Sequence, residues 1–311
     1  MRLPSTKSLA VCAALLVSVA APSRALTINL QFGSSVTGLA NFAGIQSASN
    51  YAAQQLENLF SDPITITIDV ESTPGSSVLG ESDTSLLGTY NYGDIRSALV
   101  SDATTVADAT AVAHLSLMDP TGSGHAWIVT SSQAKALGLI PSDNEVDGTF
   151  TFGAGRTYTF DPNNRAVPGA FDFIGVAEHE ITEIMGRVPG LGQQFFSEPD
   201  YLPYDLFRYS GSGTHDFTAG SGDYFSIDGG VTNLKAYNFP NGNGSDPQDW
   251  AGGTNDSFNA FSTSGTKNDI SAVDITAMDV IGFNATPTPE PATMGLVALG
   301  AAALGLRRRR G

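Results

Sequence analysis

Three polar side chains lie close together in VAEHEITEIMGR, which runs from Val176 to Arg187. Residues four apart on an α-helix share one face, so His179 and Glu183 can both point at a single metal ion. Glu180 stands beside that face, where a carboxylate can take a proton from a water molecule and pass it to a leaving amine. The spacing indicates a metal-dependent hydrolase. The alternative is an acidic amphipathic helix with a histidine on its surface.

The third ligand of such a site must come from another part of the chain, because a catalytic zinc ion is typically held by three protein ligands and a water molecule. We expect Asp205 in the segment PYDLFRYS to be that ligand, since the loop after the helix gives it ample reach. Asp200, His215 and Asp216 are the alternatives. Arg208 would pair with a ligand carboxylate and support it.

The glutamate at position 183 affects both the metal and its chemistry. Two histidines four residues apart are the usual zinc ligands of such a helix, and Glu183 replaces the second one. Two carboxylates and one imidazole neutralise a divalent ion more fully than three imidazoles, so water at the metal would be less acidic. The ligands predict Zn²⁺, with Mn²⁺ or Ca²⁺ as alternatives, and weak or absent catalysis.

The elements around this helix predict a mixed α+β fold. Residues 27–32 and 64–70 alternate like strands, residues 42–60 have helical spacing, and the helix of the site is expected over 170–187. Residues 271–281 predict a last short helix. Other elements are predicted at 92–113 (a helix in two pieces), 127–130 (strand), 132–137 (helix), 147–152 and 156–160 (strands) and 224–227 (strand).

The stretch from Asn241 to Asp249 is rich in glycine, asparagine and aspartate. We interpret it as a surface turn. Its closely spaced oxygen ligands make a calcium loop the alternative, although it lacks the full EF-hand pattern.

The first 25 residues have the order of a secretory signal peptide. Arg2 and Lys7 precede a short apolar run, and Ser23-Arg24-Ala25 places small residues where a signal peptidase cleaves. The only cysteine, Cys12, lies inside this run, so the exported chain would contain no disulfide.

The opposite end, residues 285–311, has three parts: Pro289-Glu290-Pro291, an uncharged stretch over 292–306 that predicts a short transmembrane helix, and an arginine cluster over 307–310. This order resembles the PEP-CTERM sorting signal of Gram-negative bacteria, which implies processing by an exosortase. The interpretation predicts secretion across the inner membrane and a final location at the cell envelope, the outer surface or the extracellular matrix. Residues 26–284 between the two ends are expected to form a single domain.

The charge of the chain excludes some partners. Seven of the 15 basic residues and one of the 31 acidic residues, Glu290, lie in the two end signals, which leaves 8 basic against 30 acidic residues and a net charge of −22 for the region between them. A strongly acidic surface repels nucleic acid and anionic membranes, so we expect neither as a partner.

Four segments are informative in combination: VAEHEITEIMGR, PYDLFRYSGSGTHDF, YFSIDGGVTNL and DITAMDVIGF. Together they resemble a family of secreted bacterial metalloproteases, many of which carry the PEP-CTERM tail. The resemblance implies a metzincin-like fold: a mixed twisted sheet and two helices above a cleft, and a loop-rich lower part ending in a short helix. The strands between Asp147 and Phe160 would then line the cleft as its edge. By this resemblance His179, Glu183 and Asp205 are metal ligands and Glu180 is the general base.

The sequence departs from the metzincin pattern in two ways, at the third histidine and at the methionine turn. Gly190 stands where a glycine turn is expected, but no third histidine follows it, and LPYDLFRY replaces the methionine turn. We therefore expect an exported zincin-type peptidase, in which metal-bound water attacks a peptide carbonyl of a peptide or protein substrate, with weak or no activity. The alternative is a non-catalytic protein of the cell surface or exopolysaccharide with a structural metal site.

Overall fold

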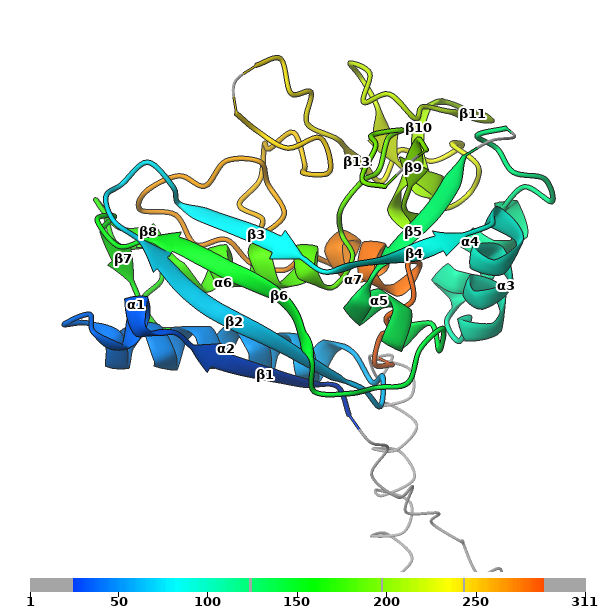
Figure 1. Ribbon diagram of the computed structural model, residues 1–311. Helices are drawn as coiled ribbons and strands as arrows, with labels where there is room; N and C mark the ends of the chain where they lie inside the picture. The colour runs from blue at the N-terminus through cyan, green and yellow to red at the C-terminus, as the bar shows by residue number, and fades with distance from the viewer. Residues whose placement is uncertain (1–24, 123–124, 197, 243, 288–311) are drawn as a thin grey trace, which may run out of the picture.

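The structure is a computed structural model that describes residues 25–122, 125–196, 198–242 and 244–287 (Figure 1). The predicted signal peptide lies outside the described residues up to residue 24. The Pro-Glu-Pro motif, the apolar stretch and the arginine cluster of the tail also lie outside them. Within the described ranges, no helix is both long enough and apolar enough to cross a membrane.

The main sheet has four strands in the order β1 (Thr27–Phe32), β2 (Thr65–Thr73), β6 (Val146–Gly153) and β3 (Gly80–Thr84). The first three strands are parallel, and β3 pairs with β6 in the antiparallel direction. The chain therefore belongs to the α+β class, as predicted.

Two helices pack side by side against this sheet. Helix α2 (Phe42–Leu59) contacts β1, and helix α6 (Phe173–Ile184) contacts β3, β6 and α2 (Figure 1). Helix α6 is shorter than predicted because Gly186, just beyond its end, has a φ of 121°, a conformation that favours glycine and does not continue a helix.

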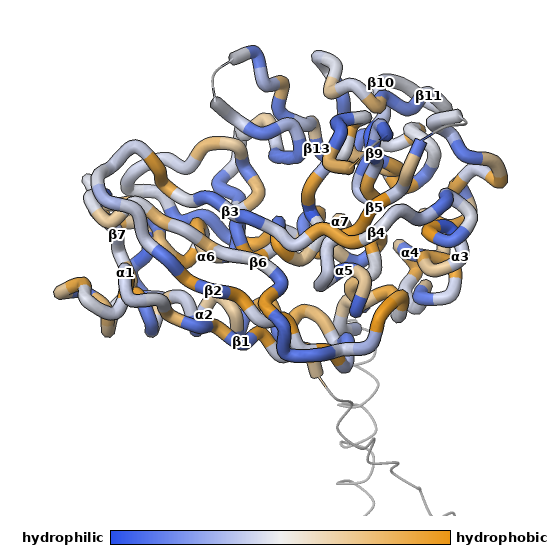
Figure 2. The backbone as a smooth tube through the Cα atoms, in the orientation of Figure 1, coloured by the Kyte–Doolittle hydropathy of each residue, from blue (hydrophilic) through white to orange (hydrophobic). Residues whose placement is uncertain are grey.

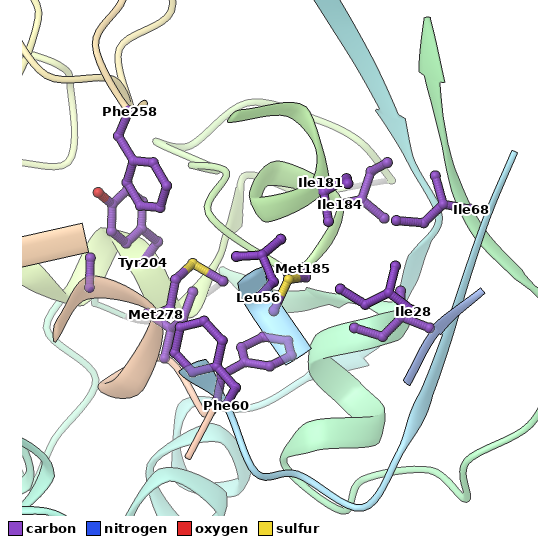
Figure 3. Packing of buried hydrophobic residues seen from close by; sticks show 14 of the residues in the cluster. Ile28, Leu56, Phe60, Ile68, Ile181, Ile184, Met185, Tyr204, Phe258 and Met278 are labelled. Atoms are coloured by element: carbon purple, nitrogen blue, oxygen red, sulfur yellow. The ribbon is translucent and has the colours of Figure 1, made fainter. Parts of the chain in front are cut away.

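The space between the sheet and the two helices is the hydrophobic core that positions the site. Ile28 and Ile68, one from each of two neighbouring strands, are buried there with Ile181 and Ile184 of α6 and with Leu56 of α2 (Figure 3). Helix α6 is buried on nearly all sides, and its isoleucines face this core while His179 and Glu183 lie on the opposite side of the helix.

The edge of the main sheet was predicted wrongly. The strand from Asp147 lies inside the sheet as β6, and the outer strand is β3, with the sequence GESDT. This segment is hydrophilic throughout, in contrast to the hydrophobic strand β5 (Ala126–Thr130) (Figure 2). It lacks the alternating apolar residues from which a strand is predicted.

A second sheet lies beside the first and has the order β4, β5, β9. Every residue of β5 is buried, and Trp127 packs against Tyr92 and Tyr201. Its other strands are β4 (Leu86–Tyr90) and β9 (Asp200–Tyr201). The helices in this part of the chain are α3 (Tyr92–Asp102), α4 (Val106–His114) and α5 (Ser131–Ala136).

The part of the chain that follows α6 is rich in loops and short strands and ends in α7 (Ala272–Asp279). A small sheet in it has the order β11, β10, β12, β13. The remaining short elements are α1 (Ser34–Thr37), β7 (Tyr158–Thr159), β8 (Phe171–Asp172), η1 (Pro203–Phe207), β10 (Arg208–Gly211), β11 (Thr214–His215), β12 (Tyr224–Phe225) and β13 (Lys235–Ala236).

Candidate metal centre

A cavity of about 770 Å³ lies along α6 and the edge strand β3. Residues 244–249 and 256–262 of the loop-rich part line its other side. His179, Glu180 and Glu183 all line this cavity from α6. The polar residues of the predicted motif therefore face a common space and not bulk solvent.

Three side chains of this cavity meet at one point. The His179 Nε2 atom lies 3.4 Å from Glu183 Oε1 and 3.4 Å from Asp249 Oδ1. One ligand atom from each of the three lies within 4.8 Å of the other two. This is the only such group of three or more metal-ligating side chains among the residues that the structure describes.

These distances fit a divalent metal ion. Ligands about 2.0–2.2 Å from a tetrahedral zinc ion lie about 3.4 Å from one another. The His179 ring is also oriented as a ligand would be, since its Nδ1–H donates a 2.7 Å hydrogen bond to the Ser257 carbonyl. In the neutral ring that bond leaves the lone pair on Nε2, which faces the two carboxylates.

Neighbouring side chains hold Glu183 in place. Ser82 on β3 donates a 2.7 Å hydrogen bond to Glu183 Oε2, and the Gln248 amide donates one of 2.8 Å to Oε1. The carboxylate is thus fixed from the edge strand on one side and from the loop-rich part on the other. Hydrogen bonds of this kind set the orientation of a metal ligand.

A buried arginine also contacts both carboxylates of the site. The Arg187 guanidinium lies 2.7 Å from Asp249 Oδ1 and 3.4 Å from Glu183 Oε1, and its side chain is 0% exposed. It stacks 4.2 Å above the Phe258 ring. Arg187 is the last residue of the quoted motif, and it has the supporting role that we predicted for Arg208.

The charges of the site shift the pKa of each group. Burial disfavours the charged His179 ring, but Asp249 and Glu183 outweigh it and raise the His179 pKa to about 10. Burial likewise opposes ionisation of Glu183, yet His179 and Arg187 lower its pKa to about 2. Burial raises the pKa of Asp249 to about 6. Metal binding would therefore displace a proton from His179 and weaken in acid.

Glu180 extends from α6 toward β3. Its carboxylate lies so close to Gly80 that a Cβ atom there would collide with it. Burial, and then the charge of Glu183, raise the pKa of Glu180 well above its ordinary value. A carboxyl group with a raised pKa at the wall of a cleft is a candidate for proton transfer.

Asp205, the predicted third ligand, lies outside the group at His179. Its Oδ2 atom accepts hydrogen bonds from the backbone N–H groups of Gly190, Leu191 and Leu202, at 2.9, 3.0 and 3.0 Å. The residue is buried and joins the turn at Gly190 to the start of η1. Asp249 takes the third position, and Asp205 holds the loop after α6.

The three alternatives to Asp205 are also engaged elsewhere. Asp200 Oδ2 accepts hydrogen bonds from the backbone of Phe195 and Phe196. The His215 ring stacks between aromatic rings of Tyr209 and Phe217. The third alternative, Asp216, accepts a hydrogen bond from the Thr218 hydroxyl. Arg208, which was predicted to support a ligand, pairs with Asp223.

The position of Asp249 follows from the fold and not from its local sequence. It ends the segment that was interpreted as a surface turn, but its side chain is 3% exposed. One signal was present: an aspartate directly before the buried Trp250. A carboxylate next to a large buried aromatic residue is itself expected to be buried and paired.

Replacing Asp205 by alanine should destabilise the protein and leave its metal content unchanged. The change leaves three backbone N–H groups without an acceptor, two of them buried and one partly buried, which should lower the free energy of unfolding by about 3 kcal/mol. Denaturant unfolding measures this loss. Asp205→Asn is the matched control, because one oxygen accepts all three bonds and an amide retains it. A folded Asp205→Ala protein that had lost its metal would contradict this assignment.

Comparison with known protein families finds one match. The PEP-CTERM protein-sorting motif matches residues 287–310. The chain is therefore an exported bacterial protein with a tail for an exosortase-type processing enzyme, located at the cell envelope or surface. The matched tail follows Thr286, whose backbone N–H donates to the Leu59 carbonyl of the folded part. No curated protein and no solved structure matches the chain.

Proposed function

We propose that the chain is an exported metal-dependent peptidase, whose metal is held by His179, Glu183 and Asp249. The observation that carries this proposal is that two carboxylate oxygens each lie 3.4 Å from one imidazole nitrogen in a cleft. Zn²⁺ suits this set, and Mn²⁺ suits its two oxygen ligands. Bound there, the metal would polarise a peptide carbonyl and acidify a water molecule.

The arrangement of the elements supports the metzincin-like part of the proposal. The resemblance implied a mixed sheet and two helices above a cleft, with a loop-rich part ending in a short helix. Here α2 and α6 lie against a sheet with one antiparallel edge strand, and the chain after α6 ends in α7. The edge strand β3 lines the cleft beside α6.

The chain's own residues supply the proton transfers of the proposed reaction. Glu180 would accept a proton from the attacking water and return it to the amine of the cleaved bond. The Ser257 carbonyl keeps the His179 ring in one tautomer, and Ser82 and Gln248 keep Glu183 in one orientation. Arg187 balances the charge of the two carboxylates.

One observation favours a second function, a non-catalytic protein of the cell surface. His179 and Arg187 together already balance the charges of Glu183 and Asp249, so this ion-pair cluster is complete without a metal. Under this alternative the cluster only fixes the loop-rich part onto α6. In some proteins, buried ion pairs of this kind specify one arrangement of the fold.

Peptide hydrolysis separates the two functions. The full chain is incubated with an unstructured protein such as casein, with and without a chelator, and Zn²⁺ or Mn²⁺ is then added back. The peptidase proposal predicts cleavage that the chelator abolishes and the metal restores. Cleavage that resists chelation, or no cleavage in the presence of either metal, would contradict it and favour the surface protein.

A further inference from the structure

A second pair of carboxylates faces each other in the loop between β11 and β12. Asp216 directly follows β11, and Asp223 directly precedes β12. Both strands flank β10 in the small sheet, so the two residues lie on either side of Arg208, the first residue of β10. The loop between them has the sequence DFTAGSGD and contains no basic residue.

One oxygen of each carboxylate points at the same place. A Cβ atom built on Gly220 would lie within 3.3 Å of both Asp216 Oδ2 and Asp223 Oδ1. The other oxygens are occupied: Asp216 Oδ1 accepts from the Thr218 hydroxyl at 2.6 Å, and Asp223 Oδ2 lies 3.2 Å from Arg208 Nη1. The two remaining oxygens therefore converge above Gly220.

Among the described residues, no donor bonds to the Asp223 oxygen that faces this place, unless it shares a proton with Asp216. The Asp223 side chain is only 1% exposed, and its Oδ1 atom is buried. A buried carboxylate oxygen without a donor is costly, and a second carboxylate beside it raises the cost. Arg208 supplies one positive charge for two negative ones, so a cation would complete the pair.

We propose that Asp216 and Asp223 bind a calcium ion above Gly220, at a site separate from the His179 centre. All of its side-chain ligands are oxygens, which are the ligands that Ca²⁺ prefers. Ca²⁺ binds ligands at about 2.3–2.6 Å and accepts backbone carbonyls and water as further ligands, so two converging carboxylates within a loop suit it. The ion would join the ends of β11 and β12.

Protonation of the pair is the competing solution. Burial raises the pKa of Asp223 to about 6. Burial also opposes ionisation of Asp216, but the Thr218 hydroxyl and backbone N–H outweigh it and lower the Asp216 pKa. A proton shared by the two carboxyl groups is therefore lost as the pH rises above about 6, and at pH 7.5 a cation would take its place.

Thermal unfolding of the full chain at pH 7.5, stripped with chelator and titrated with Ca²⁺ alone, tests this site. At a Ca²⁺ concentration about a hundredfold above Kd, the midpoint should rise by about 5 °C or more. Mg²⁺ at the same concentration should raise it less, because it requires shorter bonds and a regular octahedron. No rise with Ca²⁺, or an equal rise with Mg²⁺, would overturn the proposal.

Two variants and two controls locate the effect. Asp216→Asn leaves the partner of Arg208 intact and should abolish the Ca²⁺-dependent rise. Gly220→Ala should abolish it as well, because the new Cβ atom would occupy the place of the Asp216 oxygen. Asp69→Asn, the same change of charge on β2, and His179→Ala should each keep the rise in full. A rise that persists in Asp216→Asn and Gly220→Ala would show calcium binding elsewhere and overturn the assignment.

Discussion

Replacing Arg187 by methionine should lower the free energy of unfolding of the metal-free protein by about 3–5 kcal/mol. The side chain is fully buried, and its guanidinium contacts Asp249 and Glu183 at 2.7 and 3.4 Å. Methionine retains much of the volume over Phe258 but leaves two buried carboxylates facing each other with only His179 as a counter-charge. Denaturant unfolding in the presence of a chelator measures the loss.

Zn²⁺ should recover part of this loss, because a divalent ion at His179 neutralises the same two carboxylates. Lys267→Met is the matched control. Lys267 pairs with Asp269 at 3.0 Å, but both side chains are about half exposed, so the change should have little effect. A stability of Arg187→Met within 1 kcal/mol of the wild type would show that the arginine does not balance the charge of the site.

Glu180→Gln should retain the metal and lower kcat/KM for peptide hydrolysis by about 10²–10⁴-fold. The amide has nearly the same shape as the carboxyl group but cannot accept a proton from water. Glu180 is not one of the three converging ligands, so its loss should leave metal binding intact. Initial rates with and without added Zn²⁺, together with the metal content of the same sample, measure both effects.

The control for this variant is Glu145→Gln, which makes the same chemical change at an exposed position. It should keep full activity. Hydrolysis by Glu180→Gln at the wild-type rate would remove Glu180 from the reaction, and loss of the metal would indicate that Glu180 is a ligand.

The helix of the site could be predicted from the sequence because its information is local. The four-residue spacing of His179 and Glu183 places both on one face, and the isoleucines of α6 decide which face packs against the core. The structure brings these two residues together as expected. The strands at 27–32 and 64–70 could be predicted equally well, because their apolar residues alternate.

Asp249 and β3 could not be predicted in the same way. Asp249 lies 62 residues from Arg187 and reaches the site only because the loop-rich part folds back over α6. The residues of β3 are polar, since one side of this edge strand faces the cleft, and so they lack the alternation of a buried strand. Asp205 was a reasonable choice by distance along the chain, but three backbone donors engage its carboxylate.

The zinc content of the full chain tests the central claim most directly, namely that His179, Glu183 and Asp249 form a metal site. The protein is stripped with chelator, dialysed against Zn²⁺ and analysed for bound metal, alongside His179→Ala and Asp249→Asn. We predict one tightly bound zinc ion per wild-type chain and its loss in both variants, with each variant still folded by circular dichroism. A wild-type chain that binds no zinc, or folded variants that bind as much as the wild type, would contradict the account.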